Sequence, residues 1–211
     1  LGADRKSLLI NIGGGVVTDL GGFVASTYMR GIPFINIPTS LLAMVDASVG
    51  GKTGVDLGAL KNLVGVINNP QGVVIYPDFL ATLPTEELRS GMAEMFKHGL
   101  ISDEAYWHKM CNLSELTEAH LGSLIYESVV IKNEVVTQDP TEKGLRKTLN
   151  YGHTLGHAIE SYCLQNPNRE RLLHGEAIAI GMVLATYLSV KELGFSMDKC
   201  DQVKAVLGEY F

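Results

Sequence analysis

The sequence predicts an α/β part followed by an all-α part, and two observations favour this division. Short apolar runs bounded by glycine or proline, at residues 7–12, 34–37 and 73–76, predict buried strands. Helical patterns at residues 18–28 and 41–47 lie between them. Strands that alternate with helices are typical of a parallel sheet with helices packed against it.

The second observation is a change of pattern after Pro84. Thr85, Glu86 and Glu87 have the composition of a helix start, and only helical periodicity follows as far as Phe211. We therefore expect a boundary near residues 78–85, with an α/β domain at 1–84 and an all-α domain at 85–211. A ligand is expected in the cleft between two such domains.

Composition excludes several classes of function. The 211 residues are 46% hydrophobic and 19% charged, which is typical of a globular protein, and the net charge of −6 comes without a basic stripe. We therefore expect no nucleic acid partner, whereas local lysines still permit an anionic small molecule. The three cysteines form no CxxC pair, which argues against a disulfide framework and favours the cytoplasm. The longest apolar run, residues 177–190, is too short to cross a membrane and predicts a buried helix, so no membrane partner is expected.

A glycine turn opens the first expected helix. Gly13, Gly14 and Gly15 follow a strand, a context in which backbone N–H groups can hold a pyrophosphate. The pattern is not GxGxxG, because Thr18 occupies the place of the third glycine, and an ordinary tight turn explains it equally well. Asp19 lies near the first helical turn, where a carboxylate suits the helix dipole.

A second glycine-rich stretch, residues 46–54, carries Lys52, and Lys61 follows it in a polar gap. Lysines beside glycines can approach a phosphate closely, although solvated loop lysines have the same pattern. Arg30 before Gly31 is either another anion contact or the charged end of a helix with its glycine stop.

Three histidines form the most informative cluster. His153 and His157 are four residues apart, so they share one face of a helix, and His174 opens the next helical run. Such a group can hold a metal ion, supply a catalytic imidazole, or do both, with Glu160 and Glu176 interleaved. The ordinary alternative is that one or two of them are hydrogen-bonded core histidines.

Glu94 and Lys97 share a helix face whose neighbours are apolar, so we expect the pair to be buried and the carboxylate to need a cation. Two ligand sets then remain open. One is the His153 and His157 pair; the other combines one of these with His174 and Glu94, which leaves an open position for a catalytic zinc.

Two further cations, Lys132 and Arg146, complete the residues that can carry chemistry. Arg146 precedes Asn150 by four residues and His153 by seven, which predicts one shared helical side. Solvated helix charges are the ordinary alternative for both cations.

Several long motifs, in the same order along nearly the whole chain, resemble the 3-dehydroquinate synthase family of sugar-phosphate cyclases. They are GGGVVTDLGGFVAS, RGIPFINIPTSLLAMVDASVGGKTGVD, KNLVG, FLATLP, GMAEMFKHGLI, LRKTLNYGHTLGHAIE and LHGEAIAIGM. The resemblance implies a Rossmann-like domain joined to an α-helical domain, with NAD and a divalent metal, Zn2+ or Co2+, in the cleft. Members of the family also extend beyond both ends of this chain, so the sequence is expected to be a truncated one.

The resemblance also implies a role for particular residues. Metal ligands would be Glu94, His153 and His174, with His157 as the proton-transfer residue. Substrate contacts would be Asp46, Asn62, Lys97, Lys132, Arg146 and Asn150, together with Arg30 reaching the phosphate in the partner subunit of a homodimer. NAD contacts would be Gly15, Val16, Val17, Thr18, Asp19, Thr39, Ser40, Lys52, Lys61, Phe79, Leu80, Ala81 and Thr82.

The implied reaction converts 3-deoxy-D-arabino-heptulosonate 7-phosphate to 3-dehydroquinate and phosphate, a step of aromatic amino acid biosynthesis. It combines transient oxidation by NAD, elimination of phosphate, return of the hydride and an intramolecular aldol. The alternatives are a cyclase of the 2-deoxy-scyllo-inosose or epi-valiolone type, a metal-dependent polyol dehydrogenase, and an inactive metal-binding fragment.

Overall fold

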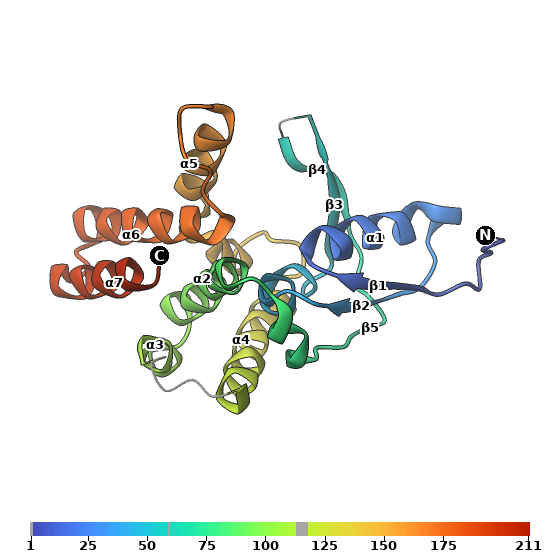
Figure 1. The fold of residues 1–211 in the computed structure, drawn as a ribbon, viewed down its shortest axis with the longest axis horizontal. Coiled ribbons are helices and arrows are strands. Elements are labelled where there is room, and N and C mark those ends of the chain that lie inside the picture. Colours follow the sequence, from blue (N-terminus) through green and yellow to red (C-terminus); the bar gives the residue numbers. More distant parts are fainter. Residues whose placement is uncertain (1, 59, 113–117) are drawn as a thin grey trace.

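The computed structural model describes residues 2–58, 60–112 and 118–211. The strands lie towards one end of an elongated molecule and the helices α2 to α7 towards the other (Figure 1). The first part contains β1 (Leu9–Gly13), α1 (Gly15–Thr27), η1 (Tyr28–Arg30), β2 (Phe34–Pro38), η2 (Ala43–Ala47), β3 (Lys52–Leu57), β4 (Leu60–Ile67), β5 (Gly72–Val73) and η3 (Pro77–Thr82). The second contains α2 (Thr85–Ile101), α3 (Glu104–Cys111), α4 (Glu118–Gln138), η5 (Leu145–Asn150), α5 (His153–Gln165), α6 (His174–Leu193) and α7 (Met197–Tyr210).

The sheet is parallel, as predicted, with strand order β1-β2-β5. The strands expected near residues 7–12 and 34–37 are confirmed with shifts of one or two residues. The third strand is shorter than predicted, because only Gly72 and Val73 pair with β2 before the chain turns away towards Pro77.

Helix α1 packs closely on this sheet through glycines. A Cβ atom on Gly21 would lie 1.9 Å from Oδ1 of Asn11 in β1, and one on Gly22 would lie 3.3 Å from Cε2 of Phe34 in β2 and 2.4 Å from Cγ2 of Thr53 in the neighbouring strand β3. Asn11 is buried and donates from Nδ2 to Oδ1 of Asn36 on the neighbouring strand at 2.9 Å. Side chains on β1 that point the other way remain half exposed, among them Ile10 and Ile12.

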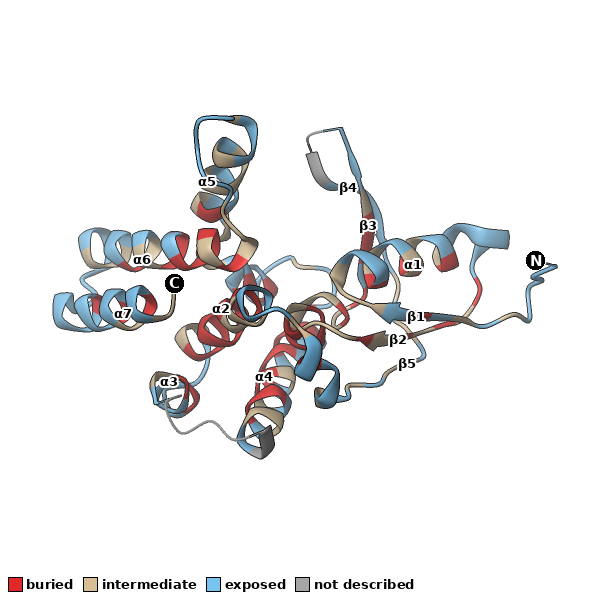
Figure 2. Cartoon of the chain, viewed as in Figure 1, coloured by how far each residue is buried: buried red, intermediate tan, exposed pale blue. Residues whose placement is uncertain are grey.

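The antiparallel hairpin of β3 and β4 was not predicted, since the sequence favoured a glycine-rich loop there. It projects from the body of the molecule (Figures 1 and 2), and Asp56 and Leu57 in the outer half of β3 are exposed. Gly54 and Gly65, which pair across the two strands, interrupt the alternation of side chains that would predict strands from the sequence. Gly65 lies so close to β3 that a Cβ atom would be 2.3 Å from the carbonyl oxygen of Thr53.

The main core surrounds α2, in agreement with the all-α second part that the sequence predicts. Its buried apolar members include Ala93, Met95 and Phe96, to which α3, α4, α6 and α7 add their own side chains. Figure 2 shows the buried residues concentrated in α2 and α4 and at the start of α6. All three cysteines carry free thiols.

Helix α6 is only partly buried, which corrects the expectation of a buried helix over residues 177–190. Ile178 and Met182 are fully buried, but Ile180, Leu184 and Leu188 are at least 40% exposed. The helix presents one face to α2, α5 and α7 and the other to solvent. Among the described residues, no helix is long and apolar enough to cross a membrane.

The expected continuous helix from Arg146 to His153 is also wrong. Residues 145–150 form the 3-10 helix η5, and Gly152 then adopts a left-handed conformation with φ of 79° before α5 begins. A Cβ atom there would lie 2.6 Å from Cγ of Met182, so glycine suits both the backbone and the packing. The break allows α5 to turn and pack against α6.

The close approach of α5 and α6 at Gly181 generates a stability prediction. A Cβ atom on Gly181 would lie 2.0 Å from the carbonyl oxygen of Gly152. We expect Gly181→Ala to lower the free energy of unfolding by about 1–3 kcal/mol, because helix backbones cannot move apart without loss of packing. Urea unfolding measures this value.

Gly208→Ala in α7 is the matched control, since no atom lies within 4 Å of its Cβ position. It should raise the same free energy by up to about 1 kcal/mol through helix propensity. Equal effects of the two substitutions would contradict the packing explanation.

Candidate metal centre and the charged residues around it

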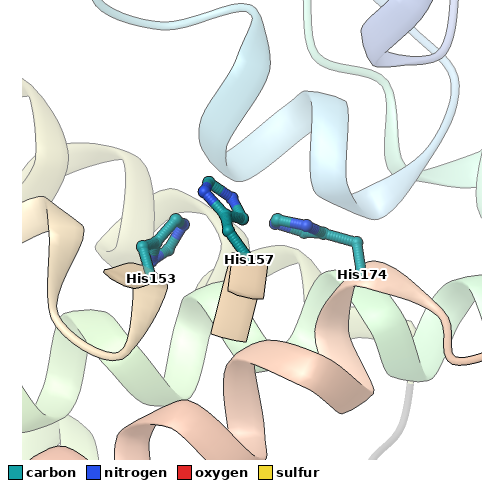
Figure 3. Close-up of side chains that lie close together, drawn as sticks. All are labelled: His153, His157 and His174. Atoms are coloured by element: carbon teal, nitrogen blue, oxygen red, sulfur yellow. The ribbon is translucent and has the colours of Figure 1, made fainter. Parts of the chain in front are cut away.

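Three histidine rings converge at the junction of α5 and α6. His153 and His157 come from the first two turns of α5, and His174 is the first residue of α6 (Figure 3). The ring centroids are 5.1 Å, 5.7 Å and 5.6 Å apart. One nitrogen of each ring lies within 4.8 Å of the others, so the group has the spacing needed to bind a metal ion.

Glu94 of α2 reaches the same point and is completely buried. Its Oε1 atom lies 3.4 Å from Nε2 of His153 and 3.7 Å from Nε2 of His174, and it accepts no hydrogen bond. Its other oxygen pairs with Nζ of Lys97, also buried. The burial of this pair confirms the prediction from its apolar neighbours.

A glycine at the start of α6 allows this helix to approach α2 closely. Gly175, which follows His174, lies against α2, where a Cβ atom would be 2.3 Å from the carbonyl oxygen of Ser90. Its backbone N–H donates to Oγ of Ser90 at 2.9 Å. The start of α6 is thereby fixed on α2, one helical turn before Glu94.

The charges around Glu94, His153 and His174 favour a cation between these side chains. Burial alone would raise the pKa of Glu94, but Lys97 and then the two histidines hold that pKa well below its usual range. Burial would lower the pKa of His174, but Glu160 and Glu94 raise it to about 9. A divalent cation would satisfy the same carboxylate and the buried Oε1 atom, so the residues fit a metal ion.

A second group of charges lies where η2 meets α4. Nζ of Lys132 donates to the carbonyl oxygen and to Oδ1 of Asp46, both at 2.5 Å. Burial would raise the pKa of Asp46, but Lys132 lowers it to about 2. Asp46, Glu94 and His98 also have ligand atoms within 4.8 Å of one another. In this group Oε2 of Glu94 is paired with Lys97 and Asp46 is paired with Lys132, whereas Oε1 of Glu94 faces the histidines, which is why we place the metal ion on the histidine side.

His98 lies behind the charges as a neutral side chain. It is completely buried, and Nδ1 lies 2.7 Å from Oγ of Ser128. Burial, and then Lys97, lower its pKa to about 3, so the ring adds no positive charge beside the lysines.

Glu142, which we did not predict, connects two of the predicted site residues. Its carboxylate accepts from Nδ2 of Asn150 at 2.8 Å and forms an ion pair with Lys52. Its φ of 57° is unusual for a residue other than glycine. The sequence shows an ordinary loop glutamate here, and the contact with Lys52 depends on where the unpredicted hairpin lies.

Arg146 is buried beside this loop. Its guanidinium donates to the carbonyl oxygens of Pro140 at 2.9 Å and Gly50 at 2.8 Å. Asp139, also missed in the sequence, holds the loop in place: its carboxylate accepts backbone N–H groups of Lys143, Gly144 and Arg146.

The predicted nucleotide-contacting residues lie mainly where the first two strands end. Gly15 to Asp19 form the first turn of α1, and the Thr39 N–H donates to the carbonyl oxygen of Gly13 at 2.9 Å. Oγ of Ser40 accepts a hydrogen bond from the N–H of Ala43, the contact that an N-cap residue makes at the start of a helix. Burial, and then Asp46, raise the pKa of Asp19 to about 7. The turn lies beside η2, since a Cβ atom on Gly15 would be 3.3 Å from Cβ of Ala47.

Other predicted residues are not brought into this group. Arg30 in η1 and Asn62 in β4 are exposed, and both have positive φ. Phe79, Leu80, Ala81 and Thr82 form part of η3, where only Leu80 is buried. The side chain of Lys61 lies outside the part of the chain that the structure describes.

A cavity of about 810 Å3 borders the site. Asn150 and Glu142 line it together with Thr141, Thr148 and Thr154, and side chains of α2 and α6 close its far wall. None of the candidate metal ligands lines this cavity.

The fold and site define a parallel α/β part with a glycine turn, joined to a helical part that carries a candidate metal centre. Two family models match the chain consecutively: 3-dehydroquinate synthase N-terminal over residues 1–90 and 3-dehydroquinate synthase C-terminal over residues 91–210. The chain belongs to the 3-dehydroquinate synthase family.

Curated relatives agree with this assignment. A 3-dehydroquinate synthase of Parabacteroides distasonis is 50% identical over the whole chain, and one of Streptococcus pyogenes is 46% identical over 98% of it. The chain spans 60% and 57% of the lengths of these two relatives.

Solved structures of related cyclases have the same fold. A 2-epi-5-epi-valiolone synthase from Streptomyces hygroscopicus, with NAD+ and Zn2+ bound, aligns with a TM-score of 0.88 at 32% identity. The match covers 99% of this chain and 59% of that one. A 2-deoxy-scyllo-inosose synthase complexed with carbaglucose-6-phosphate, NAD+ and Co2+ aligns with a TM-score of 0.85 at 29% identity, over 99% and 57% of the two chains.

The Asp139 loop generates a prediction about pH. Hydrogen bonds from the N–H groups of Gly144 and Lys143 lower the pKa of this carboxyl in the folded protein. Its stabilisation is therefore complete above the unfolded pKa of about 3.9 and is lost as the pH falls through the folded pKa. Asp139→Asn should lower the free energy of unfolding most at neutral pH, and the difference from the unaltered protein should shrink in acid.

Urea unfolding at a series of pH values measures this difference. Asp201→Asn, at an exposed position of α7, is the control and should change stability little at any pH. A constant difference between Asp139→Asn and the unaltered protein across the acidic range would contradict the assignment.

Proposed function

We propose that the chain is the catalytic part of a 3-dehydroquinate synthase, which converts 3-deoxy-D-arabino-heptulosonate 7-phosphate to 3-dehydroquinate and phosphate. The observation that carries the proposal is the buried Oε1 atom of Glu94, which has no hydrogen bond and is faced by two histidine nitrogens. The identity of 46–50% to curated 3-dehydroquinate synthases supports the choice of reaction.

Glu94, His153 and His174 would hold the metal ion, which we propose to be Zn2+ or Co2+. This set combines one buried carboxylate with two imidazoles and leaves a position open for substrate. The ion would act as a Lewis acid on the hydroxyl group that is oxidised. His157, exposed beside the other two rings, would exchange the proton of that hydroxyl with solvent.

The charged residues would bind and orient the substrate. Lys97 and Lys132, both buried next to carboxylates, provide positive charge at the inner end of the site, and Asp46 fixes Lys132 there. Arg146 and Asn150 would contact the phosphate and carboxylate groups of the substrate. Asn62, on the hairpin, would make a further substrate contact. Held by several such groups, a flexible sugar phosphate loses little entropy between successive steps.

NAD would lie against the glycine turn and supply the transient oxidation. The residues proposed to contact it are Gly15, Val16, Val17, Thr18, Asp19, Thr39, Ser40, Lys52, Lys61, Phe79, Leu80, Ala81 and Thr82. The turn opens the 13-residue helix α1, whose first N–H groups suit a pyrophosphate. In this arrangement, Glu142 would compete with the cofactor or substrate for Lys52.

Four further features belong to the proposal. The domains would be residues 1–84, for the nucleotide, and 85–211, for metal and substrate. The protein would act in the cytoplasm without a nucleic acid partner. It would form a homodimer in which the exposed Arg30 of one subunit reaches the substrate phosphate of the other.

A second candidate function is that of another sugar-phosphate cyclase. The overlap with the valiolone and inosose synthases supports it, because these enzymes share the fold over nearly the whole chain. The two candidates differ in substrate, so one assay separates them.

The first prediction from this proposal is substrate-specific phosphate release. With Zn2+ and catalytic amounts of NAD, the full chain and any native flanking sequence should release phosphate from 3-deoxy-D-arabino-heptulosonate 7-phosphate without net NADH. A phosphate assay and absorbance at the NADH band measure the two quantities. Release from glucose 6-phosphate or sedoheptulose 7-phosphate instead would favour another cyclase, and stoichiometric NADH would indicate a dehydrogenase.

The second prediction concerns the metal ligands. Glu94→Gln removes the charge of the central ligand with little change of shape, and we expect bound zinc to fall from about one ion per chain to a small fraction of that value. Elemental analysis after dialysis measures the content. Glu104→Gln, on the exposed start of α3, should keep the metal. Unchanged zinc in Glu94→Gln would refute the ligand set.

A further inference from the structure

We propose that Glu160 is a positioning residue that holds the ring of His174 so that its Nε2 atom faces the metal position. The sequence pattern placed this carboxylate among the histidines without giving it a role of its own. The inference rests on the metal site proposed above and adds a residue that acts on the metal only through another side chain.

The contacts of His174 place its ring between two carboxylates. Oε2 of Glu160, an atom without solvent exposure, lies 3.6 Å from Nδ1 of the ring, which is an ion-pair distance rather than a hydrogen-bond distance. On the opposite edge, Nε2 lies 3.7 Å from Oε1 of Glu94. Because an ionised carboxylate attracts the N–H edge of the ring, Glu160 favours a proton on Nδ1, so a metal ion would displace the proton of Nε2.

His153 has the same orientation but a different partner. Its Nδ1 atom lies 3.2 Å from the carbonyl oxygen of Tyr151, and Nε2 lies 3.4 Å from Oε1 of Glu94. A carbonyl oxygen only accepts hydrogen bonds, so both rings direct an Nδ1–H away from the site and Nε2 towards Glu94. The two differ in charge: a neutral backbone group orients His153 and a carboxylate orients His174.

The orientation of His174 therefore depends on a side chain, which a substitution can change, whereas that of His153 depends on the backbone. Glu160 and the His174 ring come from different helices, since Glu160 lies on α5 and His174 begins α6. The carboxylate therefore fixes the relative position of a ligand on α6 and the ligand His153 on α5. A carboxylate behind a metal-bound imidazole also increases the basicity of the ring.

The simplest competing explanation is that Glu160 only places negative charge near the positive N-terminus of α6. Glu176 provides the comparison. It lies in the first turn of the same helix, accepts the N–H of Leu173 at 2.8 Å and pairs with Arg89. A charge effect on the helix should appear in variants of both glutamates, whereas an orienting effect on His174 should appear only in variants of Glu160.

The test is Co2+ binding to the metal-free full chain, with Glu160→Gln, Glu160→Asp and Glu176→Gln compared to the unaltered protein. Competition with a chelator gives the dissociation constant, and the visible absorption of Co2+ reports the ligand geometry. We expect Glu160→Gln to weaken binding by roughly 10–100-fold and to change the Co2+ spectrum. Glu160→Asp should bind Co2+ with an affinity between those of Glu160→Gln and the unaltered protein, because its shorter side chain keeps the negative charge but holds it farther from His174.

Glu176→Gln should bind Co2+ with a dissociation constant within about threefold of that of the unaltered chain and with the same spectrum. A charge at the helix terminus contributes little to metal affinity when it does not contact a ligand. Glu160→Gln with unaltered affinity and spectrum, or an equal loss in both variants, would overturn the inference. Circular dichroism checks each fold, and if Glu160→Gln unfolds, Glu160→Asp is compared with Glu176→Asp by the same criteria. If the unaltered chain fails to bind Co2+ or Zn2+, the proposed metal site itself falls, and the inference with it.

Discussion

The burial of the Glu94 carboxylate constrains much of the helical half of this protein. An ionised group without solvent exposure is costly unless cations or hydrogen bonds compensate it. Lys97 compensates one oxygen, and the nitrogens of His153 and His174 face the other. To bring those groups together, α6 must pack closely on both α2 and α5, and the close approaches at Gly175 and Gly181 follow from that requirement.

The same requirement links the two halves of the chain. The pair of Asp46 and Lys132 joins η2, which follows the sheet, to α4 in the helical half. Together with Glu94 and Lys97 it makes a group of two negative and two positive charges, buried except at Asp46, whose side chain is 29% exposed. Such a balanced group tolerates burial better than any of its members alone, and the neutral His98 ring leaves that balance undisturbed.

Sequence patterns predicted those features that depend on local periodicity or on long motifs. The first two strands, the helical second part and the buried Glu94 and Lys97 pair are of this kind. The hairpin was not predicted because glycines stand where the two strands pair at Gly54 and Gly65, which removes the alternation of side chains. The break before α5 depends on the left-handed conformation of a single residue, Gly152. Glu142 is a surface-type residue in sequence and gains its contacts only from the tertiary fold, so no local pattern could identify it.

The outer edge of the sheet has a consequence for how this chain behaves in solution. Among the described strands, β1 is paired on one side only, and its Ile10 and Ile12 side chains are more than half exposed. An apolar strand with a free row of backbone donors and acceptors is a template on which further strands can assemble. The 211 residues by themselves should therefore be prone to self-association, and a partner strand on β1 would suppress it.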